Sequence, residues 1–330
     1  MNQGIVLGID GGGTYTRIVA SDLFGTVLAS AKKEGSHPGK NKNPEKNVKD
    51  AIFEVLQKAN HLPNSVRCIV GGFAGLNNPA DKLWVGNFLN VPGISCPKIL
   101  LNDAEIAQYG AFIGKHGVLA VAGTGSIVFA KTEDGNSIKN YDFHHDSVAG
   151  SRYLSYSVIY EIITQRTSYK DQQLIDQVID YWGVDTIEEL RLLAAKGFTA
   201  DKVDAIKRLS SMGAIVTKEA LNGSETARRA CKQAVKSLVT GVLLVSSTFT
   251  SDFVPLALGG GVIKTPYMED LFKKELHISN SNKNYTYHPI QLSPVMGGVL
   301  YALNEIGLPI NDGLVESFTK ADKKHQLYDS

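Results

Sequence analysis

Cysteine is scarce in this sequence, charge of neither sign is in excess, and no apolar stretch is long. The 330 residues include three cysteines, Cys68, Cys96 and Cys231, which are far apart in the chain. An odd number of separated cysteines argues against a disulfide framework or a metal knuckle. It favours a reducing compartment, so we expect a cytoplasmic protein.

The charged side chains nearly cancel. Lys and Arg number 34 and Asp and Glu number 33, which leaves a formal net charge of +1. No global field would therefore recruit nucleic acid or an anionic membrane, and we expect neither as a partner. The longest apolar run, around 238–249, is interrupted by Thr and Ser and is shorter than the ~20 residues that span a bilayer. The opening MNQGIVLGID lacks the regions of a signal peptide and predicts a strand.

The first third of the chain predicts a mixed sheet covered by helices. Strands are expected at 4–9, 15–20 and 26–31, where turns separate apolar runs as in a β-meander. An amphipathic helix at 45–60, a strand at 66–73, a helix through 80–89 and a strand at 98–101 follow. The order of three strands, helix, strand, helix, strand is typical of a helix-covered α/β sheet.

The pattern of strand, glycine turn and strand starts again at Gly117. A mostly helical stretch then extends from about 153 to 250, a strand follows at 254–263, and a helix opens at 266. A last strand is expected near 290–292, before a helix that begins around 294. This weak repeat predicts two lobes with a cleft between them. We expect a first lobe at 1–115, completed by a C-terminal helix at 305–330, and a second lobe at 116–304.

The stretch GIDGGGTYTR contains three consecutive glycines but does not open a helix. Neither the G-x-G-x-x-G nor the G-x-x-x-x-G-K-[ST] pattern occurs in its required context, which excludes Rossmann and P-loop sites. Gly11, Gly12 and Gly13 would let backbone N–H groups converge on an anion, with Thr14 beside them. Asp10 would repel that anion unless a cation lay between, so Asp10 predicts a Mg²⁺ site reached through water. The alternative is a plain glycine hairpin.

Two further glycine turns occur later in the chain. AGTGS at 122–126 is a hairpin turn in which Thr124 and Ser126 could donate hydrogen bonds to phosphate oxygens; a structural turn is the alternative. LGGGV at 258–262 follows an apolar strand and would permit close approach of a flat ring or a ribose, unless it is only a tight connection. Three such turns in this order are more specific than any one.

With these turns in place the chain resembles the sugar kinase, Hsp70 and actin superfamily, and within it the BadF/BadG/BcrA/BcrD ATPase family that includes N-acetylglucosamine kinases. The likeness extends from GIDGGGT through FAGLNNPAD, LLNDAEIAQYGA and VAGTGS to LALGGGV and SPVMGGVLYAL, in family order. It implies an α/β, two-lobed, actin-like ATPase (ribonuclease H-like) fold. Each lobe would be a mixed β-sheet flanked by helices, with the nucleotide in the interlobe cleft.

The resemblance also implies that ATP and Mg²⁺ are used. The first two turns would hold the β- and γ-phosphates, and the third would lie against the adenosine. The residues assigned in this way are Asp10, Gly11, Gly12, Gly13, Thr14, Gly123, Thr124, Gly125, Ser126, Gly259, Gly260 and Gly261.

Phosphoryl transfer to a hydroxyl needs an acceptor for its proton. Asp103 follows the apolar strand KILL, where its carboxylate would emerge at the C-terminal edge of the sheet. The resemblance matches Asp103 to the family's catalytic aspartate. The alternative is that Asp103 caps the next helix, since Asp is among the favoured N-cap residues.

The likeness fails at one place, 141–155. Kinases of this type carry G-D-E-G-S there, whose acidic residues help define the sugar pocket. Gly150 and Ser151 can be matched, but Val148 and Ala149 replace the acidic pair. The acceptor is therefore open between N-acetylglucosamine, another amino sugar such as glucosamine, an N-acetylmuramic acid-like sugar and a plain hexose, and weakened activity also fits.

Asp146, with His145, could replace the missing acidic pair from a shifted position. Equally, 142–145 could be a polar surface turn. Other sugar contacts are expected from the polar loop at 35–46, through Ser36 and His37, and from FAGLNN, through Gly75 and Asn77. The alternative for the loop is a solvated basic segment.

The sequence and the resemblance together predict a kinase for a hexose or N-acetylhexosamine hydroxyl, with the 6-hydroxyl of N-acetylglucosamine as the first expectation. A small-molecule sugar is the expected partner, and the family implies a homodimer. A non-catalytic sugar or nucleotide sensor is an alternative. The same family contains iron–sulfur activators of dehydratases, but these commonly carry a cysteine before the A-G-T-G turn, where this chain has Val121.

Overall fold

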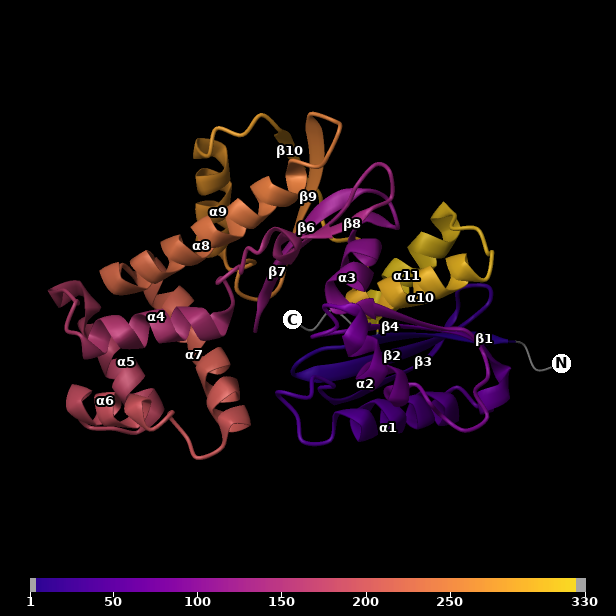
Figure 1. Ribbon diagram of the computed structural model, residues 1–330, viewed down its shortest axis with the longest axis horizontal. Helices are drawn as coiled ribbons and strands as arrows, with labels where there is room; N and C mark the ends of the chain where they lie inside the picture. Colours follow the sequence, from indigo (N-terminus) through magenta and orange to yellow (C-terminus); the bar gives the residue numbers. More distant parts are fainter. Residues whose placement is uncertain (1–3, 325–330) are drawn as a thin grey trace. The chain divides into compact units, whose positions relative to one another are not determined.

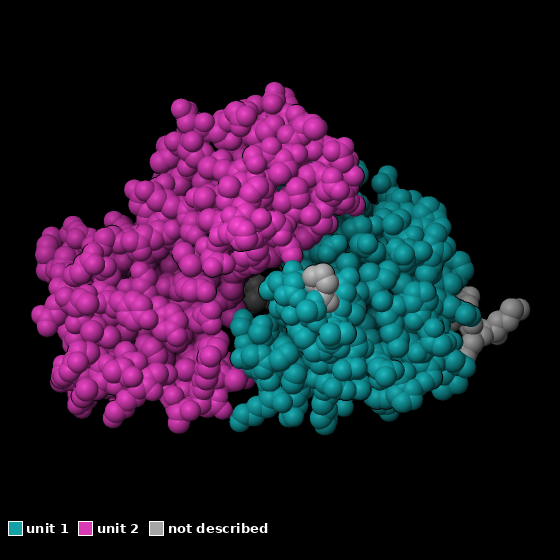
Figure 2. Space-filling model, viewed as in Figure 1, with its two compact units in different colours: residues 1–119, 288–329 teal, residues 120–287, 330 magenta. Residues whose placement is uncertain are grey.

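The computed structural model describes residues 4–324. Its internal contacts divide the chain into two compact units, drawn in different colours in Figure 2. The first unit combines the chain up to Leu119 with the chain from His288 onward, and the second unit extends from Ala120 to Tyr287. Residues 288–304 thus belong to the first unit and not to the second lobe, because the helix in this segment packs on the first sheet.

The first sheet has five strands in the order β3-β2-β1-β4-β5. Strands β1 to β4 are labelled in Figure 1. They are β1 Ile5–Gly11, β2 Tyr15–Asp22, β3 Val27–Glu34, β4 Val66–Phe73 and β5 Lys98–Asn102. β1 pairs antiparallel with β2 and parallel with β4, and β5 continues parallel to β4. The mixed sheet predicted from the sequence is therefore confirmed.

Helices cover both faces of this sheet. They are α1 Pro44–Lys58, α2 Lys82–Phe88, α3 Asp103–Phe112, α10 Pro294–Glu305 and α11 Asp312–Lys324, with 3-10 turns η1 Pro63–Ser65 and η2 Pro79–Asp81. Ile5, Leu7 and Ile9 of β1 pack in one apolar cluster with α1 and α2. Val6 packs in a second cluster with α3 and α10. Because β1 is buried on both faces, its sequence is a continuous apolar run rather than an alternation.

The two last helices of the first unit are fastened to each other. Asp322 of α11 is buried and accepts hydrogen bonds from the backbone N–H and the hydroxyl of Ser293, both at 2.6 Å. Since Ser293 precedes α10, the carboxylate satisfies the start of that helix. The helix predicted to begin around 294 is α10, which ends at Glu305. The C-terminal helix expected at 305–330 is α11, which starts at Asp312. Residues 325–330 lie outside the described residues.

The second sheet has the order β10-β9-β6-β7-β8. Its strands are β6 Gly117–Ala122, β7 Ser126–Lys131, β8 Ser137–Lys139, β9 Phe253–Gly259 and β10 Asn284–Tyr287. The last strand was predicted near 290–292, which is wrong. Residues 284–287 pair parallel with β9 instead, while the N–H groups of Gln291 and Leu292 donate to carbonyls at the end of α3.

Helices make up most of the rest of the second unit, as the sequence predicts. They are α4 Ser151–Ile163, α5 Gln172–Trp182, α6 Ile187–Ala195, α7 Lys202–Asn222, α8 Glu225–Ser246 and α9 Pro266–Ile278, with 3-10 turns η3 Asn140–Phe143 and η4 Tyr169–Asp171. Of the helices in residues 4–324, none combines the length and apolarity needed to cross a membrane.

A buried carboxylate joins the start of α5 to the start of α8. Asp171 is fully buried and accepts four hydrogen bonds, from the N–H of Ser168 (2.7 Å), the hydroxyl of Ser224 (2.7 Å), and the N–H and hydroxyl of Thr226 (both 2.9 Å). Four donors compensate the loss of water around the carboxylate. This cluster therefore fixes the helical layer of the second unit.

Candidate active site

Three parallel strands of the first sheet end in one row. The register places Gly11 of β1, Phe73 of β4 and Asn102 of β5 side by side. The chain leaves each strand at this edge, into the first glycine turn, into the segment with Gly75, and into α3. Ligand sites in parallel α/β sheets form at the carboxyl ends of the strands. The row therefore brings together most of the residues that the sequence analysis selected in the first unit.

Asp103 is the first residue of α3, and it is not the cap of that helix. The cap is Asn102, whose Oδ1 accepts the N–H of Ala104 at 2.9 Å. The Asn102 side chain also donates to the carbonyl of Leu76 (3.1 Å) and to Oδ1 of Asn77 (3.3 Å). Asn102 fills the capping position, Oδ1 of Asp103 shares the Ala104 N–H at 3.0 Å, and Asp103 stands at the edge of the sheet.

Two carboxylates face the same small region. Burial raises the pKa of Asp103, while the N–H of Ala104 and the charge of Lys40 lower it. Burial also raises the pKa of Asp10 to about 7, which Arg17 opposes and the charge of Asp103 supports. The Arg17 guanidinium lies 3.8 Å from Oδ2 of Asp10, and the Asp10 side chain is only 14% exposed. Two desolvated acids close enough to affect each other favour a cation between them.

The side chains of Phe73 and Ser36 pack closely against the first glycine turn. The N–H of Gly12 donates to the carbonyl of Tyr15 at 2.9 Å, which closes the hairpin. A Cβ on Gly11 would lie 2.3 Å from Cδ1 of Phe73 and 2.5 Å from Oγ of Ser36, so only glycine fits. The Ser36 hydroxyl is buried and has no hydrogen-bond partner among the described residues. A cradle without side chains beside an unsatisfied hydroxyl fits a polar ligand.

The sugar candidates of the first unit lie around the same edge. His37 lies against Gly75, where a Cβ would be 2.9 Å from Nε2 of the imidazole. The Nδ1 atom of His37 accepts the N–H of Gly39 (3.0 Å), so a neutral ring carries its proton on Nε2. Burial and the charge of Lys40 lower the pKa of His37. Asn77 joins the group through Asn102, which precedes Asp103.

Sequence reasoning missed two cations here, Arg17 and Lys40. Arg17 pairs directly across the hairpin from Asp10. That partner could have been found by counting back from the glycine turn, because a hairpin fixes its register. Lys40 lies over Gly13, whose Cβ would be 3.0 Å from the lysine Nζ. No spacing rule singles out Lys40 among the lysines of its loop.

In the second unit the two remaining glycine turns are adjacent. The N–H groups of Val262 and Ile263 donate to the carbonyl of Ala122 at 3.0 and 3.2 Å. Gly260 has a φ of +93°, and a Cβ there would lie 2.5 Å from the carbonyl oxygen of Ala122. Backbone therefore approaches backbone at this point, and Gly123–Ser126 and Gly259–Gly261 form one surface.

Ser126 has a different role from the one expected. Its hydroxyl donates to the carbonyl of Ser147 and accepts the N–H of Ala149 (3.0 Å), so it is engaged in fixing the following segment. The N–H of Ser151 donates to the carbonyl of Gly123 at 2.8 Å, which seats the start of α4 on the same turn. The Thr124 side chain is half-buried and remains the hydroxyl available for a phosphate in this turn.

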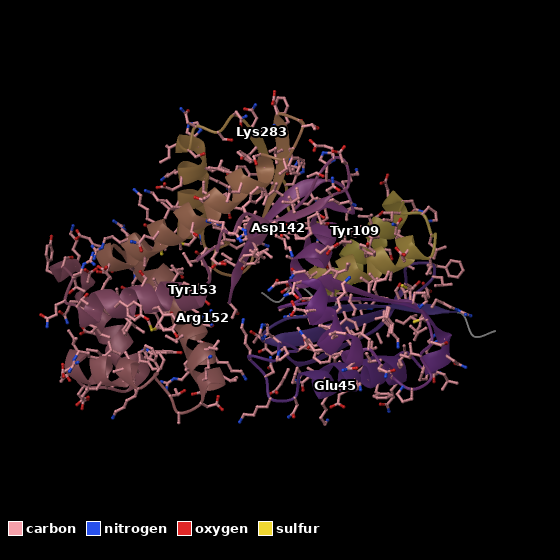
Figure 3. The ribbon with its side chains drawn as sticks, in the orientation of Figure 1. Glu45, Tyr109, Asp142, Arg152, Tyr153 and Lys283 are labelled. Carbon is pink, nitrogen blue, oxygen red and sulfur yellow. The ribbon has the colours of Figure 1, made fainter. Side chains whose placement is uncertain are left out.

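The segment that departs from the family pattern is partly a surface turn. The side chain of Asn140 joins this segment to β7, because it accepts the N–H of Val128 and donates to the carbonyl of His145. Asp142, labelled in Figure 3, is exposed and accepts the N–H of Lys139 at 2.8 Å. Asp146 is exposed as well, and it is the predicted sugar residue that belongs to the second unit.

Comparison with known proteins gives consistent results. A model of the BadF/BadG/BcrA/BcrD ATPase family matches residues 7–302. An N-acetylmuramic acid/N-acetylglucosamine kinase of Clostridium acetobutylicum is 26% identical over 285 residues, which is 83% of this chain and 90% of the relative. An N-acetyl-D-glucosamine kinase of Dictyostelium discoideum is 24% identical over 327 residues, covering 92% and 99%.

Solved structures share the fold. A protein of Chromobacterium violaceum, described as a candidate N-acetylglucosamine kinase, has a TM-score of 0.71 at 21% identity over 92% of this chain and 100% of that one. A glucokinase of the ROK family from Streptomyces griseus has a TM-score of 0.54 at 18% identity, covering 91% and 98%. The predicted actin-like ATPase fold with two mixed sheets is therefore confirmed. Since the family model spans nearly all of the described residues, this chain belongs to the BadF/BadG/BcrA/BcrD ATPase family.

Proposed function

We propose that the protein transfers the γ-phosphoryl group of ATP to a hydroxyl of a hexose or N-acetylhexosamine, in the first place the 6-hydroxyl of N-acetylglucosamine. The observation that carries this proposal is the carboxylate of Asp103, which lies at the edge of the first sheet and close enough to Asp10 for the two charges to interact. Both curated relatives described above bear the name of N-acetylglucosamine kinases.

Asp103 is the proton acceptor in this mechanism. The acceptor oxygen bonds to the γ-phosphorus, the bond from that phosphorus to the bridging oxygen breaks with its electron pair leaving on ADP, and the hydroxyl proton passes to Asp103. Burial raises the pKa of Asp103, which makes its carboxylate a better base than one in water. The cap by Asn102 holds the helix start that carries Asp103.

The chain's own residues fit a phosphate and a cation. The turn at Gly11 to Gly13 carries no side chain between its backbone N–H groups and a bound phosphate, and Thr14 follows it. Gly123 to Thr124 with Gly259 to Gly261 would serve the remainder of the nucleotide. Bound Mg²⁺ would neutralise phosphate charge. Asp10 offers the oxygen ligand that this ion prefers, and Mg²⁺ in proteins usually keeps several of its water ligands. Residues 4–324 contain no group of three or more acidic, His or Cys side chains that could hold a metal ion directly. We therefore propose that Asp10 holds the ion through water.

Ser36, His37, Gly75 and Asn77 are the proposed acceptor contacts. A neutral His37 can donate from Nε2 to a sugar oxygen, and the unsatisfied Ser36 hydroxyl can donate or accept. N-acetylmuramic acid and glucosamine are alternative acceptors, because Val148 and Ala149 stand where the family has acids. Asp146 is proposed as a contact from the second unit.

The test is ADP release with Mg²⁺-ATP across N-acetylglucosamine, N-acetylmuramic acid, glucosamine, N-acetylmannosamine, glucose and no sugar. The proposal expects one N-acetylhexosamine to exceed the sugar-free rate by at least about tenfold, since a well-placed acceptor gains from proximity. Binding of sugar and ATP with no ADP above background would mean a sensor.

Light scattering tests the homodimer that the family resemblance implies, and fractionation tests the cytoplasmic location.

An iron–sulfur activator is disfavoured by the thiols. Cys68 lies in β4 of the first unit and Cys231 in α8 of the second. Burial raises the pKa of each thiol to about 12. Such apolar surroundings are typical of cysteines that pack as small hydrophobic residues, whereas reactive thiolates lie in exposed, electropositive surroundings.

Replacing Asp10 with alanine is expected to weaken Mg²⁺-ATP about tenfold more than ATP in EDTA, because loss of a water-bridged carboxylate affects mainly the ion. Isothermal titration calorimetry of both forms measures this. Asp50→Ala, which removes an acid of α1 from an exposed ion pair, is the matched control. Equal weakening of both ATP forms by Asp10→Ala would remove Asp10 from the metal site.

A further inference from the structure

Lys40 is held over the first glycine turn by its neighbours. The loop from β3 to α1 is fastened to that turn by Asn41, which is buried and whose side chain donates to the carbonyls of Gly13 (3.0 Å) and His37 (3.2 Å). The N–H of Lys40 also donates to the carbonyl of His37 at 3.0 Å. Lys40 therefore has a fixed starting point, unlike a lysine on a solvated loop.

The ammonium group of Lys40 lies over Gly13. A Cβ on Gly13 would be 3.0 Å from both Cδ and Nζ of the lysine, so the absence of a side chain on Gly13 is what admits Lys40. The lysine is half-buried, and its electrostatic attraction to an anion bound at the turn is therefore stronger than it would be in bulk water.

The field of Lys40 reaches the predicted catalytic residues. Its charge lowers the pKa of Asp103 and also the pKa of His37. Lys40 is therefore close enough to Asp103 and His37 for its charge to act on both. Arg17 has a different position, because it is paired with Asp10 across the hairpin at 3.8 Å. The two cations thus serve different parts of the site.

We propose that Lys40 binds the γ-phosphate of ATP through its Nζ and neutralises the charge of the phosphoryl group while that group moves to the acceptor. This inference rests on the proposed kinase function. Lys40 stays protonated throughout, and the acceptor proton goes to Asp103. A lysine is a point charge with three donors, which suits a group whose three oxygens carry spread charge in the transition state.

Nucleotide affinity tests the proposal without turnover. For Lys40→Met, isothermal titration calorimetry with Mg²⁺ is expected to show about a tenfold loss for a non-hydrolysable ATP analogue and less than about a twofold change for ADP, since only the analogue has a γ-phosphate. Lys42→Met removes an exposed lysine two residues away in the same loop and should change neither affinity. Equal losses for ADP and the analogue, or no loss for either, would overturn the proposal.

Kinetics separate this role from a structural one. Lys40→Met is expected to lower kcat about 10²-fold with the KM of the sugar within about threefold, and Lys40→Arg should recover most of the loss, because the charge is retained. A lower kcat with unchanged affinity for the ATP analogue would mean that Lys40 acts only on Asp103, against the proposal. If wild-type protein phosphorylates no sugar, the kinase function fails while the nucleotide titrations still decide on Lys40.

The wild-type protein offers a check if the methionine variant does not fold. Amine modification of Lys40, followed by peptide mass mapping, is expected to slow at least about fivefold with the ATP analogue and to stay within about twofold with ADP, because a bound γ-phosphate would cover Nζ. Modification of Lys42 is the internal control. Equal protection of Lys40 by both nucleotides, or by neither, contradicts the proposal.

Discussion

Asp103→Asn is expected to lower kcat about 10³-fold while the affinity for ATP stays within about threefold of wild type. An amide cannot take the proton of the sugar hydroxyl, but it has the size of the carboxylate. Its oxygen can still accept the N–H of Ala104, which Oδ1 of Asp103 accepts at 3.0 Å, so the start of α3 is retained. ADP release under saturating sugar gives kcat, and calorimetry gives the affinity.

Glu105→Gln is the matched control for this experiment. Glu105 is in the same first turn of α3 and carries the same charge. Its replacement should change kcat by less than about threefold, because a general acid-base effect depends on the group at the reacting atom. An Asp103→Asn protein with near wild-type kcat would exclude Asp103 as the base. A similar loss in both variants would attribute the effect to the charge of the helix start.

Asp171→Ala is expected to lower the free energy of unfolding of the second unit by about 3 kcal/mol. The substitution leaves the buried N–H of Thr226 and the partly buried N–H of Ser168 without their acceptor, and an unsatisfied buried donor costs about 1–3 kcal/mol. Urea unfolding followed by the fluorescence of Trp182, which lies at the end of α5, reports on this unit. A Trp84→Phe background removes the other tryptophan signal.

The same carboxylate gives a pH dependence with a defined sign. Burial alone would raise the pKa of Asp171, but its four hydrogen bonds outweigh burial and lower the pKa from 3.8 to about 2. Because the folded pKa is below the unfolded value, the carboxylate contributes about 2 kcal/mol above pH 4, and this is lost as the pH falls toward 2.

Wild-type protein should therefore lose stability between pH 4 and pH 2 more steeply than Asp171→Ala. The control is Asp176→Asn, an exposed acid of α5 that should behave as wild type. Parallel curves for wild type and Asp171→Ala would contradict the lowered pKa. The measurement remains the urea midpoint by Trp182 fluorescence at each pH.

Strands buried on two faces could be predicted from the sequence, and an exposed edge strand could not. IVLGI is apolar throughout and VRCIV is interrupted only by the exposed Arg67, because helices cover both sides of β1 and β4. NYTY in β10 is an edge strand with mostly exposed side chains, so hydrophobicity gives it no signal. The sequence predicts the strand at 290–292 instead, where Ile290 and Leu292 are apolar. In the structure this segment forms only single hydrogen bonds to the end of α3.

The residues of the candidate site also differ in whether the sequence alone could identify them. Glycine turns and an acid after an apolar strand are local patterns, so Asp10, Asp103 and the turns could be selected from sequence. The partners of those residues depend on distant segments. The sequence predicts that the Ser126 hydroxyl donates to a phosphate. In the structure this hydroxyl donates to the carbonyl of Ser147 and accepts the N–H of Ala149. Lys40 reaches Gly13 only because Asn41 folds its loop back on the turn.

The split composition of the first unit has a consequence for the order of synthesis. Val6, Val19 and Val70 point into an apolar cluster that α10 and α11 complete with Val295 and Phe318. The ribosome releases all of residues 120–287 before it makes these two helices. One apolar face of the first sheet thus stays uncovered while the second unit already has every residue of its own core, and domains fold as units during synthesis. The helix that begins with Asp103 shares this cluster through Ile106, so its packing partners on α10 and α11 are among the last residues to be translated.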